Sequence, residues 1–238
     1  MSLPEHFETR IRNAWLGRVS GCMLGKAVEL FSMREGHGAL TRYLTQVDAL
    51  PLRSYIPFDA QYASRFVFAP CCKDQIDAST ADDDINYSVL ALMLLEAHGE
   101  HLTTDHVARS WLKHLPAGST FTAERAAYKV LLSEGNEWFA EGADPGFDLS
   151  HCADNPYNNW IGAQIRADVY GWVCPGHPER AASLATTDAQ LSHRGDGIYG
   201  AVVVAVMGAM LGGGRSLPEA VQTALEFIPE SSACHNVI

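Results

Sequence analysis

Apolar residues recur every three or four positions along most of this chain, which is the spacing of one face of an α-helix. The first such segment covers residues 7 to about 30. Further helices are predicted over residues 85–97, 104–115, 124–133, 161–171, 178–191, 201–211 and 218–227. No segment alternates as strongly in the manner of a β-strand. The pattern therefore predicts an all-α fold, a multi-helix globular array rather than a simple bundle.

The pattern also predicts how some of these segments pack. Residues 85–97 are apolar on almost every face, which indicates a central buried helix. Gly17, Gly21 and Gly25 lie four residues apart on one face of the first helix, where small residues let a second helix approach closely. Residues 35–77 lose the periodicity and contain several prolines, so we expect loops and short helices there.

Composition limits the function classes. The 238 residues are 47% hydrophobic, and they suit a single globular domain spanning residues 1–238. A net charge of −11 argues against nucleic-acid or anionic-membrane partners. The longest apolar stretch, Ala201 to Leu211, is too short to span a bilayer. The six cysteines form no Cys-x-x-Cys pattern, so free thiols in a reducing cytoplasm are expected.

Three consecutive acids, Asp82, Asp83 and Asp84, precede the apolar helix at residue 85. The partial positive charge at a helix N-terminus stabilises each exposed carboxylate by ~0.3–1 kcal/mol. Two neighbouring carboxylates repel by roughly 3–4 kcal/mol at an effective dielectric near 20, so a partly buried cluster needs a cation. Mg²⁺ with carboxylate and water ligands is the candidate. A fully solvated cluster would instead be a plain helix start.

A second motif runs from Asn155 to Asp168 and combines a turn, Gly162 at a helix entry, and Arg166. Backbone N–H groups at such an entry can bind phosphate, with the arginine as a clamp. The small residues at Gly162 and Ala163 would equally serve close packing. The motif alone leaves both interpretations open.

A third segment, residues 192–200, places His193 and Asp196 among three glycines. These glycines indicate a flexible backbone beside a polar pair that could meet a ligand. A histidine in such a loop is also a common structural hydrogen-bonding group. Here too the two interpretations remain open.

Taken together and in order, these segments resemble the ADP-ribosylglycohydrolase family, which includes the dinitrogenase reductase-activating glycohydrolases. The matching residues are 21–29, 81–87, 160–172 and 192–200. The resemblance implies an all-α fold with a binuclear Mg²⁺ site at the base of an ADP-ribose cleft. It also implies hydrolysis of the bond between ADP-ribose and an acceptor, either a protein side chain or a small conjugate.

The resemblance also implies roles for particular residues. Asp82, Asp83 and Asp84 correspond to the metal-binding motif, with Asp82 and Asp83 as catalytic carboxylates. The residues implied to contact substrate are Glu29, Gly162, Arg166, Asp168, His193, Asp196 and Tyr199.

The chain departs from the family pattern in two places. Ala81 stands where the family has a threonine ligand, for which Thr80 would substitute after a register shift. The family's second acidic cluster, Asp-x-Asp followed by Thr or Ser, has no counterpart after Phe227. We therefore expect a C-terminally truncated domain. The alternative function is a non-catalytic relative that binds ADP-ribose.

Overall fold

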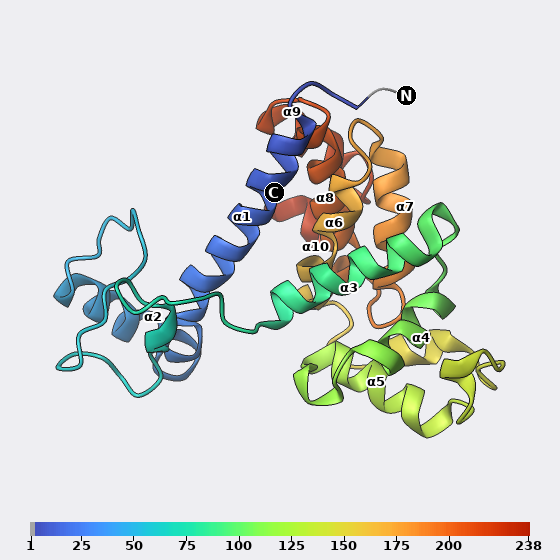
Figure 1. Cartoon of the computed structure of the whole chain (residues 1–238), viewed down its shortest axis with the longest axis horizontal. Helices are drawn as coiled ribbons and strands as arrows, with labels where there is room; N and C mark the ends of the chain where they lie inside the picture. The colour runs from blue at the N-terminus through green and yellow to red at the C-terminus, as the bar shows by residue number, and fades with distance from the viewer. Residues whose placement is uncertain (1–2) are drawn as a thin grey trace. The chain divides into compact units, whose positions relative to one another are not determined.

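The computed structural model of the chain describes residues 3–238 as helices joined by loops, without a β-sheet in that range (Figure 1). The α-helices are α1 (Phe7–Lys26), α2 (Glu29–Gln46), α3 (Asp83–His98), α4 (Thr104–His114), α5 (Thr122–Glu134), α6 (Asp168–Trp172), α7 (Pro178–Ala189), α8 (Gly195–Gly212), α9 (Leu217–Leu225) and α10 (Ala233–Val237). The 3₁₀ helices are η1 (Ala69–Cys71), η2 (Gly99–His101), η3 (Ala117–Ser119), η4 (Phe139–Glu141), η5 (Leu149–Ala153) and η6 (Ile161–Arg166). The predicted all-α fold is confirmed.

The chain divides into two compact units, and each is described by itself. One unit comprises residues 12–85, and the other comprises residues 3–11 and 86–238. The divisions fall inside α1 and α3. The prediction of a single domain therefore stays a prediction.

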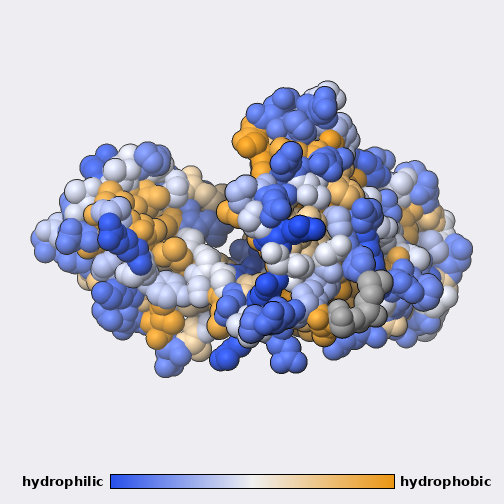
Figure 2. Space-filling view, turned by 90° about the horizontal axis from the view of Figure 1, so that it is seen from above, coloured by the Kyte–Doolittle hydropathy of each residue, from blue (hydrophilic) through white to orange (hydrophobic). Residues whose placement is uncertain are grey.

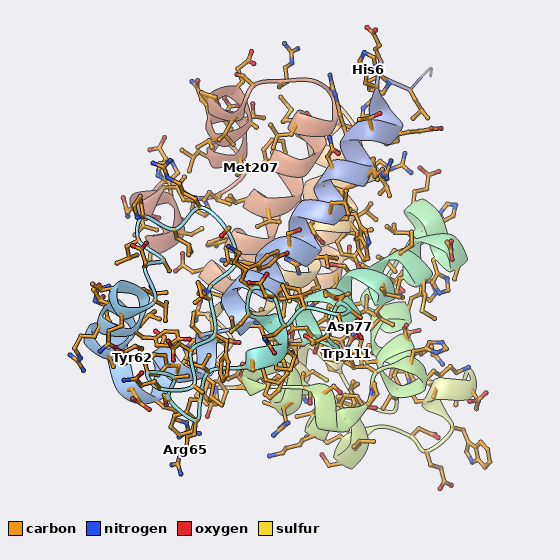
Figure 3. The ribbon with its side chains drawn as sticks, turned by 60° about the vertical axis from the view of Figure 1, so that its left-hand side comes forward. His6, Tyr62, Arg65, Asp77, Trp111 and Met207 are labelled. Atoms are coloured by element: carbon orange, nitrogen blue, oxygen red, sulfur yellow. The ribbon has the colours of Figure 1, made fainter. Side chains whose placement is uncertain are left out.

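The unit of residues 12–85 has its own small core. Phe31 and Tyr43 meet edge to face in this core, with ring centroids 5.8 Å apart, and Ile56 is also buried there. α2 continues to Gln46 with a break at Gly36, where φ is +83°. The expectation of loops and short helices from residue 35 is wrong for this part and fits only the segment after α2, which carries Tyr62 and Arg65 (Figure 3).

The unit of residues 86–238 is built around α8, which packs against α6, α7 and α9. Trp111, labelled in Figure 3, is fully buried in the main core of this unit. α8 begins at Gly195, six residues before the predicted start. By length and composition it could cross a membrane, yet half of it is buried in the unit, as in the core helix of a globular protein. The prediction that the apolar stretch from Ala201 to Leu211 is too short to span a bilayer is therefore corrected, because the helix that contains it is longer.

Helix boundaries elsewhere lie close to the predictions. α7 begins at Pro178, where proline suits the first helical position. α4 begins at Thr104, as predicted, and is capped by Thr103, whose hydroxyl accepts from the backbone N of His106 (3.3 Å). The predicted helix over residues 161–171 is instead η6 followed by α6.

The central burial predicted for residues 85–97 holds for only part of α3. Leu90 and Leu94 are buried, whereas Val89 and Leu92 are exposed. Figure 2 shows such hydrophobic residues scattered among hydrophilic ones on the face that it presents. Scattered apolar residues of this kind are ordinary on a folded surface.

Candidate metal centre and buried charge cluster

The acidic run lies at the start of α3, in the unit of residues 12–85. Asp82 stands just before the helix and accepts a hydrogen bond at Oδ1 from the backbone N of Asp84 (3.0 Å). Ligand atoms of Cys22, Asp82 and Asp84 lie within 4.8 Å of one another. α1 contributes the cysteine, so this group joins two segments about sixty residues apart in the sequence.

Two cations reach into this cluster from α1. The Lys26 ammonium donates to Oδ2 of Asp82 (2.7 Å) and to the carbonyl of Ala81 (2.6 Å). Arg18 donates to the backbone carbonyl of Asp84 (2.9 Å), and its guanidinium lies 3.7 Å from Oδ1 of that residue. Lys26 therefore pairs with Asp82, and Arg18 pairs with Asp84.

The electrostatic environment differs among the acidic residues. Burial raises the pKa of the Asp83 carboxyl to about 6, and the charge of Asp82 adds to this effect. Burial also raises the pKa of Asp84, although Arg18 opposes the shift. Burial also acts to raise the pKa of Asp82, but the hydrogen bonds from Lys26 and from the backbone N of Asp84, together with the Lys26 charge, outweigh it and lower the pKa. Burial therefore disfavours the charged forms of Asp83 and Asp84, whereas Asp82 is held ionised by its partners.

A cavity of about 480 Å³ opens beside these carboxylates. It is lined by Gly17, Arg18, Gly21, Cys22, Gly25 and Lys26 of α1, by Glu29 at the start of α2, and by Asp82 and Asp84. The glycine face of α1 therefore lines a cavity instead of receiving a second helix, which corrects that prediction. The absence of side chains at these glycines is what leaves the space.

The chemistry of these donors fits a hard divalent cation. Carboxylate oxygens with water are the ligands that Mg²⁺ prefers. Cys22 adds little, because burial and the nearby Asp82 raise the pKa of its thiol to about 12 and keep it protonated. The Thr80 hydroxyl lies 3.4 Å from Sγ of Cys71 and 3.5 Å from Sδ of Met23. Thr80 therefore faces sulfur atoms and does not replace the hydroxyl missing at Ala81.

Arg166 lies in the other unit, and its guanidinium is fully buried. It donates to Oε1 of Glu124 (2.8 Å), to a carboxylate oxygen of Asp188, and to Oγ of Ser192 (2.9 Å). Tyr170 donates its hydroxyl to the second oxygen of Asp188 (2.6 Å). Each of the three guanidinium nitrogens donates a hydrogen bond within the protein. Arg166 is therefore not available to clamp a phosphate, and this prediction is corrected.

Gly162 also has a packing role in this structure. A Cβ at this position would clash with the carboxylate of Glu124, so only glycine allows that carboxylate to reach Arg166. Of the two interpretations open for Gly162 in the sequence, the structure favours close packing. The buried Glu124 carboxyl has a raised pKa, which the Arg166 charge partly offsets.

His193 is fully buried beside this cluster and does not line a cleft. Its Nδ1 hydrogen-bonds with Oγ of Ser192 (2.8 Å), and its Nε2 lies 3.8 Å from Oε1 of Glu124. Within residues 3–238, Nε2 has no hydrogen-bond partner. Burial and the Arg166 charge lower the pKa of the imidazole to about 3, so it is neutral at pH 7.

The remaining candidates hold segments of this unit together. Asp168 is buried and accepts from Oγ of Ser88 (3.1 Å) and from the backbone N of Val169 (2.9 Å). Asp196 accepts from the backbone N of Cys234 (2.8 Å) at the start of α10. Tyr199 is half-buried against the α8–α9 core cluster. The glycines beside Asp196 belong to the first turns of α8, and so the predicted flexible loop is corrected.

The sequence interpretation missed four charged residues: Lys26, Arg18, Glu124 and Asp188. Lys26 carried a local signal, since it lies four residues after Cys22 on the same face of α1. Glu124 and Asp188 carried no spacing signal, because their partner Arg166 is 42 and 22 residues away.

Comparison with known proteins gives one match. The family model described as ADP-ribosylglycohydrolase matches residues 3–237. No curated protein and no solved structure matches the chain.

Proposed function

Because the chain belongs to the ADP-ribosylglycohydrolase family, we propose that it hydrolyses, with Mg²⁺, the glycosidic bond between ADP-ribose and an acceptor. Membership of the family indicates a hydrolase that acts on ADP-ribose conjugates in general. The acceptor is a protein side chain or a small conjugate. Free thiols throughout residues 3–238 and a net charge of −11 suit a cytoplasmic enzyme without a nucleic-acid or membrane partner.

One observation supports this proposal most strongly. The carboxylates of Asp82 and Asp84 border an open cavity of about 480 Å³. Asp83, the first residue of α3, lies between them in the sequence but is not among the residues that line this cavity. The pKa of the Asp83 carboxyl is raised, first by burial and then by the neighbouring negative charges of Asp82 and Asp84. A divalent cation at the cavity would supply positive charge beside these carboxylates.

The residues of the cluster have distinct tasks in this mechanism. Asp82 and Asp84, whose carboxylate oxygens lie close together at the cavity, would hold the metal, and Asp83 is a further ligand that the family motif implies. The metal would polarise oxygen ligands and orient the ribose hydroxyls. A carboxylate of Asp82 or Asp83 accepts a proton from the attacking water. The water oxygen bonds to the anomeric carbon while the bond to the acceptor breaks through an oxocarbenium-like state. The acceptor leaves with the proton that the carboxylate took from the water, which restores the carboxylate, and free ADP-ribose is the second product.

A second candidate function is a non-catalytic protein that binds ADP-ribose. One observation favours it: the Lys26 ammonium already bonds Asp82, so part of the cluster is neutralised without a metal. Ala81 also lacks the hydroxyl that the family motif has at this position.

The experiment is an ADP-ribose release assay on conjugates linked through nitrogen and through oxygen, with Mg²⁺ or with EDTA. Release that requires Mg²⁺ and is lost in Asp83→Asn supports the hydrolase. Asp77→Asn is the matched control, because Asp77 is exposed and lies outside the cluster (Figure 3). Binding of ADP-ribose in calorimetry without release from any conjugate would support the non-catalytic alternative. Neither binding nor release would contradict both.

A further inference from the structure

The Lys26 ammonium contacts the same carboxylate oxygen of Asp82 that a bound metal ion would need as a ligand. It bonds Oδ2 of Asp82 and the carbonyl of Ala81, at 2.7 and 2.6 Å. The Asp82 side chain is only 10% exposed, so this ion pair is largely shielded from water. Shielding matters because charges attract or repel each other far more strongly away from bulk solvent.

Both oxygens of Asp82 are engaged in the structure. Oδ1 accepts from the backbone N of Asp84 (3.0 Å), and Oδ2 accepts from Lys26. The hydrogen bond from the backbone N of Asp84 is part of the first turn of α3, so breaking it would disturb the helix start. The lysine contact is made by the end of a flexible side chain and is the one that a metal would displace.

In its position on Asp82 the ammonium also lies over an aromatic ring. The Phe68 ring centroid is 5.7 Å from Nζ of Lys26, within the range of a cation–π contact. The backbone N of Phe68 donates to the carbonyl of Ala27 (2.9 Å), which fixes this residue beside the end of α1. The Phe68 ring is therefore a partner next to the ammonium that does not depend on the bond to Asp82.

We propose that Lys26 is a resident counterion that competes with the divalent cation for Asp82, so that the protein binds metal only as the ammonium moves away. This inference rests on the proposed function, because it assumes that the Asp82–Asp84 cluster is the metal site. Lys26 is a positioning residue in this role and takes no part in bond breaking. Its effect is to weaken metal affinity and to stabilise the metal-free protein.

The test is titration of Mg²⁺ alone into the metal-free protein by calorimetry, for the wild type and for Lys26→Met. We expect Lys26→Met to bind Mg²⁺ about tenfold more tightly or better, which corresponds to about 1.4 kcal/mol. Lys26→Arg keeps a cation and should stay close to the wild type. Lys129→Met is the matched control, since it removes the same charge from an exposed residue of α5 in the other unit.

Thermal unfolding gives an independent readout. In EDTA, Lys26→Met should unfold at a lower temperature than the wild type, because Asp82 loses its partner. Added Mg²⁺ should then raise its unfolding temperature by more than it raises that of the wild type. Lys26→Gln, which keeps polar contact without charge, serves if the methionine variant does not fold, and the same tighter binding is expected.

The outcomes separate this inference from the proposed function. If the wild type binds Mg²⁺ and the neutral variants bind it equally well or more weakly, Lys26 is not a competitor and only this inference fails. If neither the wild type nor any variant binds Mg²⁺, the metal-site assignment fails and this inference fails with it. Tighter binding in Lys129→Met as well would show a general charge effect and would also overturn it.

Discussion

Arg166 and Glu124, 42 residues apart in the sequence, form an ion pair inside the larger unit, with Nη1 of the guanidinium 2.8 Å from Oε1 of the carboxylate. Asp188 pairs with the same guanidinium from α7. Both carboxylate side chains are 4% exposed, so the cluster is almost completely enclosed. The cluster therefore joins α5, η6 and α7 and cannot be reached by a ligand from solvent.

Replacing Arg166 with methionine should strongly destabilise the protein. Glu124 and Asp188 would remain buried without their guanidinium, and breaking a buried ion pair in this way costs about 3–5 kcal/mol. Urea unfolding of Arg166→Met measures the loss. Arg125→Met is the control, because Arg125 is exposed and should change stability by less than about 0.5 kcal/mol. A variant of normal stability that has lost ADP-ribose affinity would instead restore the phosphate-clamp interpretation.

Adding one methyl group at Gly162 should also destabilise the fold. The new Cβ would overlap the Glu124 carboxylate and push it away from Arg166. Overpacking of a filled interior costs about 1–3 kcal/mol. The comparison is Gly118→Ala, where a Cβ meets no atom within 4 Å, measured by the same urea unfolding. Equal stabilities of the two variants would contradict the packing role of Gly162.

His193 should make the protein lose stability in acid. Burial lowers the pKa of the folded-state imidazole from 6.5 to about 3, so between these values the unfolded chain binds a proton that the folded protein does not. Stability contributed by His193 is therefore complete above pH 6.5 and falls by about 1.4 kcal/mol per pH unit below it. His193→Gln removes this titration and should show a flatter profile of unfolding free energy between pH 4 and pH 6.5. Parallel profiles for the two proteins would refute the assignment.

Replacing Asp83 with alanine should weaken Mg²⁺ binding while sparing the metal-free fold. Loss of groups that merely support metal ligands already costs about 10–100-fold in affinity, so a direct ligand should cost at least as much. The metal-free protein should keep or gain stability, because burial of the Asp83 carboxylate and repulsion from Asp82 disappear. Calorimetry with Mg²⁺ and urea unfolding in EDTA test the two halves, with Asp77→Ala as the control. Unchanged affinity would make the acidic run a solvated helix start.

Local sequence signals predicted the helices well where the signal and its cause lie within one turn. α7 begins at the predicted proline, and α9 begins one residue after Ser216, whose hydroxyl forms a capping box with Glu219. α8 was predicted six residues too short because Gly195, Gly197 and Gly200 are typical of loops. In the folded protein Gly197 and Gly200 allow close contact with Asn158 and Gln164, which no local pattern shows.

The sequence by itself determined the all-α class, most helix positions and the family, because helical periodicity and ordered motifs are local properties of the chain. It also located the acidic run at the start of α3. Only the tertiary structure decided what each charged residue meets. Lys26 and its partner Asp82 are 56 residues apart, and Arg166 meets its two carboxylates at separations of 42 and 22 residues. The burial and charge that set the role of Arg166, His193 and Lys26 come from these distant partners, and sequence spacing carries no record of them.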